Sequence, residues 1–519
     1  MARRTRLTPL AKLLIVVLVV GGGYYAATQF GLLDNLIPSP ENNNNNGGNE
    51  TTQVETGDLI TNEDDIIDIG VVTWGGYAGG QYWNNGFEPT KASQYYKDHG
   101  FAVKFHVLDD FAPSRDAFNA GIVDLLWCTI DAFPTEANGL DAQVVFQADW
   151  SRGGDAIVVR RGINSVADLK GKSIAVAELT PSHSFLIWLL DAGGLTTKDV
   201  KIKPMDSAID AATAFKSGSV DAAVVWSPDD QDCVEKVRGS KVLENTKNAS
   251  NIIADVFIAK KDFIESNKER LGQLYDGWMR GAAEINGSDD AKVKASKILA
   301  NGLNLPEDFT YNAINNVRLT THGDNENFFG MNRDYNGVTG EDLYNKMGTI
   351  YQKLGYIDGK VPSYRLVTNK NIVSRSSLSG TEGQAAEGKK TFTKVTEEDK
   401  QKEAISSKQV SISFRSGEYK LDENSKYIID LQFADIARTF SNARIRIEGN
   451  TDNVGNYDNN KKLSYLRAQS VAQYLQQEYG FDENRFVIVG NGSDKSISDN
   501  STAAGRAENR RTDFELIAE

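Results

Sequence analysis

The side chains able to do covalent or metal chemistry are few and widely separated in this sequence. The four histidines are His99, His106, His183 and His322. None of them stands at a metal-ligand spacing from another or from the two cysteines, Cys128 and Cys233. The serine-nucleophile, zinc-protease and phosphate-loop motifs do not occur in the sequence. We therefore expect no catalytic residue, no metal site and no cofactor.

Four short stretches between residues 67 and 367 place glycine, hydroxyl, aromatic or charged side chains where a β-rich run ends or a helical run begins. Helix starts with Ser and Thr hydroxyls suit an anionic group, and tryptophan rings stack on a planar group or hold a cation. Ligand sites in α/β sheets lie at such strand ends, so these positions are candidate solute contacts. The candidates are Trp74, Gly75, Tyr77, Ser114, Thr180, Ser182, His183, Trp226 and Asp229.

Each of these candidates also has a structural explanation. Trp74 and Trp226 are explained equally well as core residues, and Ser114 and Ser182 as helix caps, although a cap can also contact a ligand. His183 fits a solvent-facing position in the first turn of a helix better than it fits a catalytic base. The sequence leaves these alternatives open.

The elements that must position these side chains change along the chain. Residues 67–367 alternate short β-rich runs with amphipathic stretches such as 181–192 and 208–216, which is the pattern of an α/β domain. All seven tryptophans lie there. Residues 406–519 follow a second periodic pattern that predicts the order βαβαββ, an α/β sandwich of two layers.

An ordered set of motifs runs through residues 406–519. It comprises residues 447–455, Asn460, residues 463–468, residues 490–492, Asn500 and residues 505–511. Together they resemble the OmpA C-terminal family over the whole length of that domain. Asn450 stands where histidine is frequent in the family, which is a conservative polar change. The resemblance implies a domain that binds peptidoglycan without a covalent bond.

The resemblance also implies which residues contact the wall. The diaminopimelate of the peptidoglycan stem peptide ends in a zwitterion, whose recognition needs a carboxylate for the ammonium and a guanidinium for the carboxylate. In the family these contacts fall on Asp452 and Arg467, with Asn460, Leu463 and Arg510 as pocket wall or support. The alternative is an Asp452–Arg467 salt bridge within the domain and no ligand.

A second resemblance covers the middle of the chain. It is carried by residues 119–124, 165–172 and 212–228, with two A-x-x-x-G-x-V-D endings at Asp124 and Asp221. These stretches resemble the nitrate, sulfonate and thiamine-precursor group of periplasmic solute-binding proteins. The resemblance implies a two-lobed type II periplasmic-binding-protein fold within 67–367, with a ligand cleft between the lobes. Lobe one would contain residues 67–155 and 250–366, and lobe two residues 156–249.

Four other conspicuous residues of this region have plainer explanations. We expect Asp124 and Asp221 to be structural turn residues, each at the place where a helix returns to a strand. We expect Trp127 and Trp188 to be core residues.

The N-terminal segment has the features of a membrane anchor. Residues 13–33 contain no charged side chain and follow the basic residues of segment 1–12. That length suits one bilayer-spanning helix, and the positive-inside rule keeps 1–12 in the cytoplasm and exports the rest. A cleaved signal peptide is the alternative. The polar stretches 34–66 and 368–405 are predicted to be linkers.

Composition narrows the function further. The net charge of −14 argues against a nucleic-acid partner. Cys128 and Cys233 fit either one disulfide or two buried thiols. We predict an inner-membrane-anchored periplasmic protein that binds a small solute, with an anion as one candidate, and also grips peptidoglycan. An inner-membrane ABC permease is the partner this would serve.

Two other functions stay open at this point. A structural tether or sensor between membrane and wall would use the same elements without feeding a transporter. An enzyme built on the same two-lobed fold would need a cleft histidine or cysteine with a base, and His183 is the nearest candidate.

Overall fold

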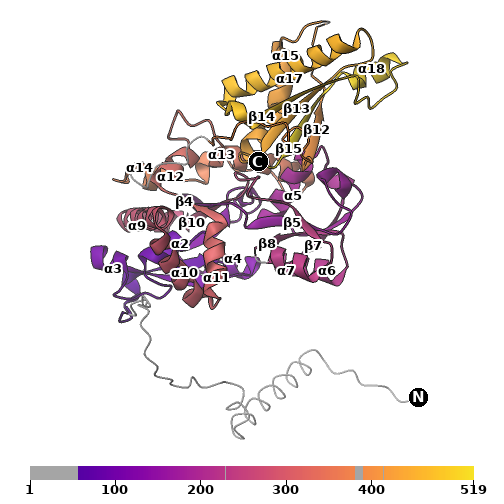
Figure 1. Ribbon diagram of the computed structural model, residues 1–519. Helices are drawn as coiled ribbons and strands as arrows, with labels where there is room; N and C mark the ends of the chain where they lie inside the picture. Colours follow the sequence, from indigo (N-terminus) through magenta and orange to yellow (C-terminus); the bar gives the residue numbers. More distant parts are fainter. Residues whose placement is uncertain (1–56, 228, 380–389, 413, 416) are drawn as a thin grey trace, which may run out of the picture. The chain divides into compact units, whose positions relative to one another are not determined.

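The computed structural model describes residues 57–227, 229–379, 390–412, 414–415 and 417–519 (Figure 1). The predicted anchor at 13–33 and most of the predicted linker 34–66 lie outside these residues. Within the described ranges, no helix combines the length and the apolar composition needed to cross a bilayer. All the described residues belong to one compact unit by their mutual contacts.

A six-stranded sheet forms the first lobe, in the order β11-β4-β10-β3-β1-β2. Strands β1, β2 and β3 are parallel, and β10 lies antiparallel between β3 and β4. Its strands are β1 (Ile66–Val71), β2 (Ala102–Val107), β3 (Leu125–Thr129), β4 (Ala142–Ser151), β10 (Ala254–Lys260) and β11 (Val317–Leu319). The accompanying helices are α2 (Ala78–Trp83), α3 (Gln94–His99), α4 (Phe111–Ala120), α8 (Lys261–Ser266), α9 (Lys268–Gly287), α10 (Asp289–Leu303), α11 (Glu307–Asn315), α12 (His322–Phe328), α13 (Gly340–Leu354) and α14 (Asn371–Ser374).

A five-stranded sheet forms the second lobe, in the order β7-β6-β8-β5-β9. Its elements are β5 (Asp155–Val159), β6 (Ser173–Ala177), α5 (Pro181–Ala192), β7 (Lys201–Met205), α6 (Ala208–Ser217), β8 (Ala222–Trp226), α7 (Asp229–Lys236) and β9 (Lys241–Asn245). Strand residues alternate between the two faces. Ala175 and Ala223 pack with Phe215 of α6, whereas Val176 and Val224 belong to the core that contains Phe185 of α5. Helices therefore cover both faces, and the predicted two-lobed α/β architecture is confirmed.

The chain passes between the lobes twice, from β4 to β5 and from β9 to β10. Hydroxyl groups tie the two crossings together. Ser151 Oγ donates to Asp155 Oδ2 at 2.7 Å and lies 2.8 Å from Thr246 Oγ1, which also accepts from Gly153 N at 2.7 Å. These side chains form a hydrogen-bonded hinge beneath the space between the lobes.

The two predicted turn aspartates do the same work in both lobes. Asp124 Oδ2 accepts from the backbone N–H of Asp68 in β1 at 3.0 Å, and Asp221 Oδ2 accepts from the backbone N–H of Ser173 in β6 at 2.8 Å. Gly121 and Gly218 adopt φ of +73° and +88° just before them, a conformation that glycine adopts without strain. The repeated motif therefore closes a helix and fastens the next strand to its neighbour.

Asp221→Ala is expected to lower the free energy of unfolding by about 1–3 kcal/mol, because it leaves a strand N–H without its acceptor. Urea denaturation measures the change. Asp206→Ala, which removes an exposed carboxylate from the same lobe, is the matched control and should stay within about 0.5 kcal/mol of the wild type. Equal stability of the two variants would contradict the structural role of Asp221.

The C-terminal domain is a four-stranded sheet in the order β12-β15-β13-β14. Its elements are β12 (Ser406–Val410), α15 (Glu423–Ile429), a wider π turn (Asp430–Ala434), α16 (Asp435–Thr439), β13 (Arg444–Asn450), α17 (Tyr457–Tyr479), β14 (Phe486–Gly492), α18 (Ala503–Asn509) and β15 (Thr512–Ile517). The predicted order βαβαββ was wrong in one respect, because helix α18 separates the last two strands. Thr502 Oγ1 caps it by accepting from Gly505 N at 2.9 Å, and seven residues are too few for a clear helical period.

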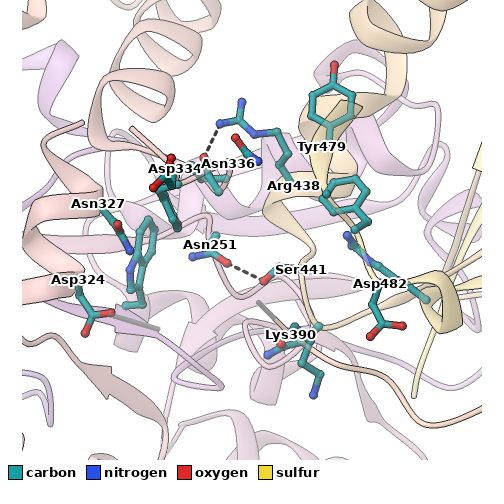
Figure 2. A pocket seen from close by; sticks show the side chains of 18 of the residues that line it. Asn251, Asp324, Asn327, Asp334, Asn336, Lys390, Arg438, Ser441, Tyr479 and Asp482 are labelled. Carbon is teal, nitrogen blue, oxygen red and sulfur yellow. Dashed lines mark hydrogen bonds between the residues drawn. The ribbon is translucent and has the colours of Figure 1, made fainter. Parts of the chain in front are cut away.

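Side chains of the C-terminal domain contact both lobes. Lys408 of β12 pairs with Asp191 of α5 at 2.7 Å, and Arg438 of α16 donates to Asp342 of α13 at 2.7 Å. Ser441 Oγ donates to Asn251 Oδ1 at 2.6 Å, beside the second lobe crossing. A pocket lies beside Arg438 and the Ser441–Asn251 contact (Figure 2). Its lining comes from the first lobe, the second crossing and the C-terminal domain.

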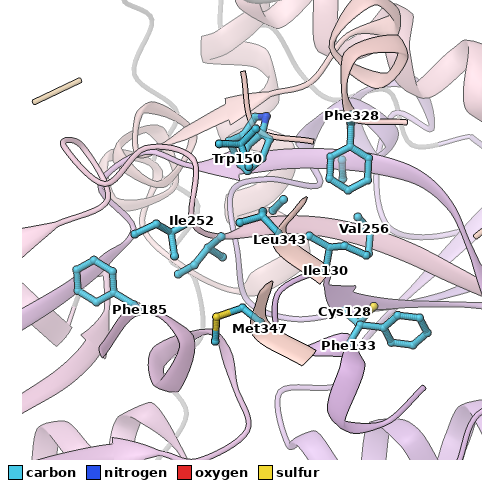
Figure 3. Packing of buried hydrophobic residues seen from close by; sticks show 14 of the residues in the cluster. Cys128, Ile130, Phe133, Trp150, Phe185, Ile252, Val256, Phe328, Leu343 and Met347 are labelled. Atoms are coloured by element: carbon cyan, nitrogen blue, oxygen red, sulfur yellow. The ribbon is translucent and has the colours of Figure 1, made fainter. Parts of the chain in front are cut away.

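The main apolar core extends from the six-stranded sheet to helices α13 and α5 (Figure 3). Cys128 and Val256 contribute from the strands, Leu343 and Met347 from α13, and Phe185 from α5. Cys128 and Cys233 are both buried free thiols in different lobes, so the second of the two predicted alternatives holds. Trp188 is buried, as expected of a core residue.

Candidate functional site

A small cavity lies between the two lobes. It is lined by Val72, Trp74, Trp127, Asp155, Pro181, Trp226, Ile253 and Asp255. The six-stranded sheet and the loop after β1 supply one side, and β5, the end of β8 and the start of α5 supply the other. The strand ends that the α/β pattern marks as ligand positions therefore meet at one place.

Hydrogen bonds hold two of the three lining tryptophans. Trp74 Nε1 donates to Asp149 Oδ2 at 2.8 Å, and Trp226 Nε1 donates to Ser182 Oγ at 2.9 Å. A Cβ atom at Gly154 would stand 2.0 Å from Cη2 of Trp74, so only glycine leaves room for that ring. Both indole rings are thus positioned by the protein before any ligand arrives.

Two lining residues are buried carboxylates. Asp155 and Asp255 are 2% and 5% exposed. Ser151 Oγ donates to Asp155, and Tyr77 Oη donates to Asp255 Oδ2 at 2.7 Å. Burial raises the pKa of Asp155 to about 7 and raises the pKa of Asp255 well above its ordinary value. Burial also raises the pKa of Asp149 to about 8. Two carboxyl groups of the lining, and a third that contacts Trp74, therefore resist ionisation.

Several of the predicted solute contacts lie at or beside this cavity. Trp74 and Trp226 line it, and Trp74 also packs against the core. Ser182 and Tyr77 lie one contact away, against Trp226 and Asp255. Gly75 serves packing instead, because a Cβ there would stand 2.4 Å from the carbonyl oxygen of Ala313.

The other four predicted contacts have structural partners away from the cavity lining. Ser114 Oγ donates to Phe111 O at 2.7 Å, and Thr180 Oγ1 donates to Ala177 O at 2.8 Å. Asp229 lies 3.8 Å from Lys216 Nζ. The fourth is His183.

The solvent-facing position predicted for His183 was wrong. Its side chain is buried, and its ring packs edge-on against Tyr351 and Tyr356 at centroid distances of 5.4 and 5.2 Å. Burial lowers the pKa of His183 to about 4. Helix α5 turns this residue toward α13, a contact that local sequence cannot reveal.

Sequence reasoning missed three of the groups at the cavity. Trp127 was expected only in the core, yet it is both buried and part of the lining. Asp155 and Asp255 were not considered at all. A signal existed, because each carboxylate interrupts or begins an otherwise apolar strand, and a charge in such a place needs a partner or a function.

The C-terminal candidates gather around a different opening. Asp452 Oδ2 pairs with Arg510 Nη1 at 2.6 Å, so the predicted alternative of an Asp452–Arg467 bridge is not the pairing found. Arg467 Nε donates instead to the carbonyl oxygen of Glu418 at 3.0 Å. Asn460 Nδ2 donates to Val454 O at 3.0 Å and so fixes the loop that carries Asp452.

Three arginines line the hollow beside this pair. Arg467, Arg510 and Arg511 line a hollow that is open to solvent. Burial and the nearby charge of Arg510 lower the pKa of Arg467. Leu463 is half-buried on the same helix, α17. The hollow offers several guanidinium donors to a carboxylate, next to one acidic side chain.

Comparison with known proteins assigns both regions. Residues 413–510 match the OmpA family, and residues 86–288 match the NMT1/THI5 like family. The chain joins an NMT1/THI5-like domain to an OmpA-family domain. Both matches fall on the regions whose geometry is described above.

Individual relatives resemble parts of the chain. Outer membrane porin F of Pseudomonas aeruginosa is 39% identical over 111 residues, which is 21% of this chain and 31% of that protein. A Brucella abortus protein named as a binding protein is 27% identical over 196 residues, 37% of this chain and 60% of its own. The chain thus spans under two thirds of either relative. The Escherichia coli aliphatic sulphonate binding protein SsuA aligns with 60% of this chain and 99% of its own, at 19% identity and a TM-score of 0.47.

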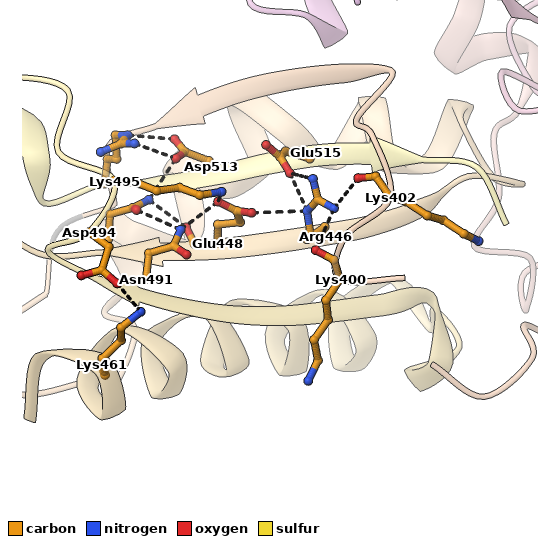
Figure 4. A network of polar contacts seen from close by, with 12 residues as sticks. Lys400, Lys402, Arg446, Glu448, Lys461, Asn491, Asp494, Lys495, Asp513 and Glu515 are labelled. Carbon is orange, nitrogen blue, oxygen red and sulfur yellow. Dashed lines mark hydrogen bonds and ion pairs between the residues drawn. The ribbon is translucent and has the colours of Figure 1, made fainter. Parts of the chain in front are cut away.

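A buried polar network supports the sheet of the OmpA-family domain (Figure 4). Glu448 accepts from Asn491 Nδ2 at 2.8 Å and from Lys495 Nζ at 2.6 Å. Arg446 pairs with Glu515 and donates to the carbonyl oxygen of Lys402 at 2.7 Å. The second contact holds the segment before β12, part of the predicted linker 368–405, against the sheet.

The same network reaches the arginine-lined hollow. Asn450 Nδ2 donates to Asp513 Oδ2 at 2.9 Å, and Asp513 pairs with Arg511 at 3.0 Å. Asn450 and Arg511 both line the hollow. The amide at 450 therefore helps to position a guanidinium of the OmpA-family site.

Proposed function

We propose that this protein captures a small solute in the cleft of its NMT1/THI5-like domain and holds peptidoglycan through its OmpA-family domain. The cavity between the lobes carries the first half of the proposal. It has ligand-ready tryptophans and a hinge at its base. Closure of two lobes around a solute is the usual action of such an arrangement.

The arginine-lined hollow supports the second half. A diaminopimelate end offers one ammonium and one carboxylate, and the hollow offers Asp452 beside Arg467, Arg510 and Arg511. In the structure, the guanidinium of Arg510 forms an ion pair with the carboxylate of Asp452. Ligand binding would exchange that contact for the diaminopimelate ammonium and leave the guanidinium groups to the carboxylate.

The proposed location follows from segment 13–33 as an inner-membrane anchor, with the folded part in the periplasm. There the protein would pass its solute to an inner-membrane ABC permease. A tether or sensor with no transporter is the second candidate, and its support is the set of contacts between the OmpA-family domain and both lobes. Through those contacts lobe closure and wall attachment would influence each other.

The buried position of His183 argues against an enzyme on this fold. Its ring nitrogen Nδ1 accepts from Leu179 N at 3.3 Å, and Nε2 is enclosed. No cysteine lines the cavity among the described residues. We therefore propose binding rather than catalysis.

Screening the full-length protein against a library of small metabolites is expected to raise its melting temperature with at least one compound. At about 100 times Kd, a ligand adds about 2.7 kcal/mol, or about 4–5 °C for a domain of about 300 residues. Trp226→Leu should remove the shift because the ring lines the cavity. If no compound raised the melting temperature, solute capture would be contradicted and the tether or sensor would be the remaining candidate.

A further inference from the structure

The charged residues of the cleft indicate the class of solute more narrowly than the shape of the cleft does. This inference rests on the proposed solute-binding function. Two carboxylates line the cavity, and no basic side chain does so among its described lining residues. Asp149 and Asp131 act electrostatically on Asp255, so they add negative potential once they are ionised. At a pH at which these carboxyl groups are ionised, they would repel a nitrate or a sulfonate.

We propose that the solute of this cleft is a small organic cation, bound by the carboxylates of Asp155 and Asp255 and by the rings of Trp74 and Trp226. An ammonium group would interact favourably with both the carboxylates and the tryptophan rings. It pairs with the acidic oxygens, and the faces of tryptophan rings attract it electrostatically.

The two carboxylates lack a charged partner in the free protein. Within the described ranges, neither Asp155 nor Asp255 forms an ion pair. Their recorded side-chain donors are neutral hydroxyls, Ser151 for one and Tyr77 for the other. A buried charge without a counter-ion is costly, and proteins retain it where a ligand or a metal supplies the missing charge. No cluster with metal-ligand geometry occurs in the described chain.

The basic side chain packed against Trp127 is already neutralised. Arg115 lies over the ring of Trp127 at 4.9 Å, but it forms two hydrogen bonds with Glu136 at 2.8 and 2.9 Å. The carboxylate of Glu136 therefore balances the charge of Arg115. Arg115 does not convert the cavity into an anion site.

The hydrogen-bond donors of the lining also disfavour an anion. The indole N–H groups of Trp74 and Trp226 are used by Asp149 and Ser182. Trp127, which is 3% exposed, has an Nε1 atom without a partner. One free neutral donor suits a hydroxyl or carbonyl oxygen on the cation. It does not balance the charge of an anion.

The raised pKa values agree with this assignment. Burial raises the pKa of Asp155 to about 7, with Asp131 and Asp230 adding repulsion. A cation would favour the ionised carboxylates, so a permanently charged ligand should bind more tightly at pH 8 than at pH 6.

Isothermal titration of the detergent-solubilised full-length protein at pH 8 tests the proposal with choline, protonated ethanolamine and ethanesulfonate. We expect heat from at least one of the cations and none from ethanesulfonate. Asp155→Asn and Asp255→Asn should each weaken binding of that cation by about 10- to 100-fold. Glu235→Gln removes the same charge from the exposed surface of lobe two and should change the affinity less than about twofold.

The outcomes separate this inference from the function on which it rests. Ethanesulfonate binding without cation binding would overturn the cation assignment and preserve solute capture. No binding of either cation up to about 10 mM would also overturn the assignment, and the metabolite screen would then decide whether capture itself fails. If both aspartate variants bound the cation as the wild type does, the cation would bind outside this cavity and the proposal would be wrong. A cooperative melting transition at or above the wild-type temperature would show that the variants are folded.

Discussion

Replacing Arg467 with alanine is expected to weaken retention of the full-length protein on purified sacculi by about 10- to 100-fold. The side chain is 8% exposed, lines the hollow, and is held by the Glu418 carbonyl and over the ring of Phe414 at 4.9 Å. Its guanidinium is therefore in place before a ligand carboxylate arrives. Co-sedimentation at increasing sacculus concentration measures the loss.

Two further variants separate binding from folding. Lys462→Ala removes a charge from the exposed side of the same helix, α17, and should leave retention within about twofold. Arg467→Lys keeps the charge but loses the planar fork, so we expect an intermediate loss. Wild-type retention of Arg467→Ala would refute the wall site proposed here.

Asp452 tests the other half of the same site. Because Arg510 now neutralises Asp452 at 2.6 Å, the ammonium of the ligand must displace that contact. Asp452→Ala should then lose retention about as strongly as Arg467→Ala. Arg510→Ala should lose less, since it frees Asp452 while removing one of the three arginines.

Raising the pH from 5 to 8 is expected to destabilise the ligand-free protein by several kcal/mol. Burial raises the pKa of Asp131 and Asp155 to about 7, of Asp149 to about 8 and of Glu244 to about 7. Unfolded carboxyls titrate near pH 4. The folded state therefore holds protons that the unfolded state has released, and stability is lost as the pH rises toward the folded pKa values. Each group contributes up to about 1.4 kcal/mol per pH unit between these limits.

Two buried histidines oppose this trend, because burial lowers the pKa of both His183 and His322. The pKa of His183 is lowered to about 4, so its contribution grows as the pH rises to about 6.5. Four carboxyls outweigh two imidazoles, and the net slope should be negative. Urea denaturation at pH 5, 6.5 and 8 measures it, and Asp155→Asn should flatten the slope. A free energy of unfolding that increases steadily over this range would contradict the buried, uncompensated cluster.

The buried carboxyl groups of Asp131, Asp149 and Asp155 would lower the stability of the cleft and also serve its proposed function. Its carboxyl groups gain no internal counter-ion, so their cost is recovered only when a ligand supplies positive charge. The hinge formed by Ser151, Asp155 and Thr246 places one of these carboxyls at the pivot of the two lobes. Binding and closure would thus act on the same side chain.

Local sequence determined much of this protein. Helical periodicity predicted helix 181–192, which the structure has as Pro181–Ala192, and the repeated glycine–aspartate ending predicted a turn in each lobe. Both depend on residues within a few positions of one another, where backbone geometry follows from side-chain type. The motifs around Asp452 and Arg467 likewise marked the OmpA-family domain as a whole.

Tertiary structure alone decided the chemistry of the cleft. Asp155 and Asp255 stand 100 positions apart, and they meet only because β5 and β10 lie at the two crossings between the lobes. Tertiary packing also decides that His183 is buried against α13, where the sequence predicted a solvent-facing position. It likewise decides that Asp452 pairs with Arg510 and not with Arg467. Periodicity tells which face of an element is apolar, but the partner that covers this face depends on packing between distant segments. The charge that a ligand must carry is a property of that packing.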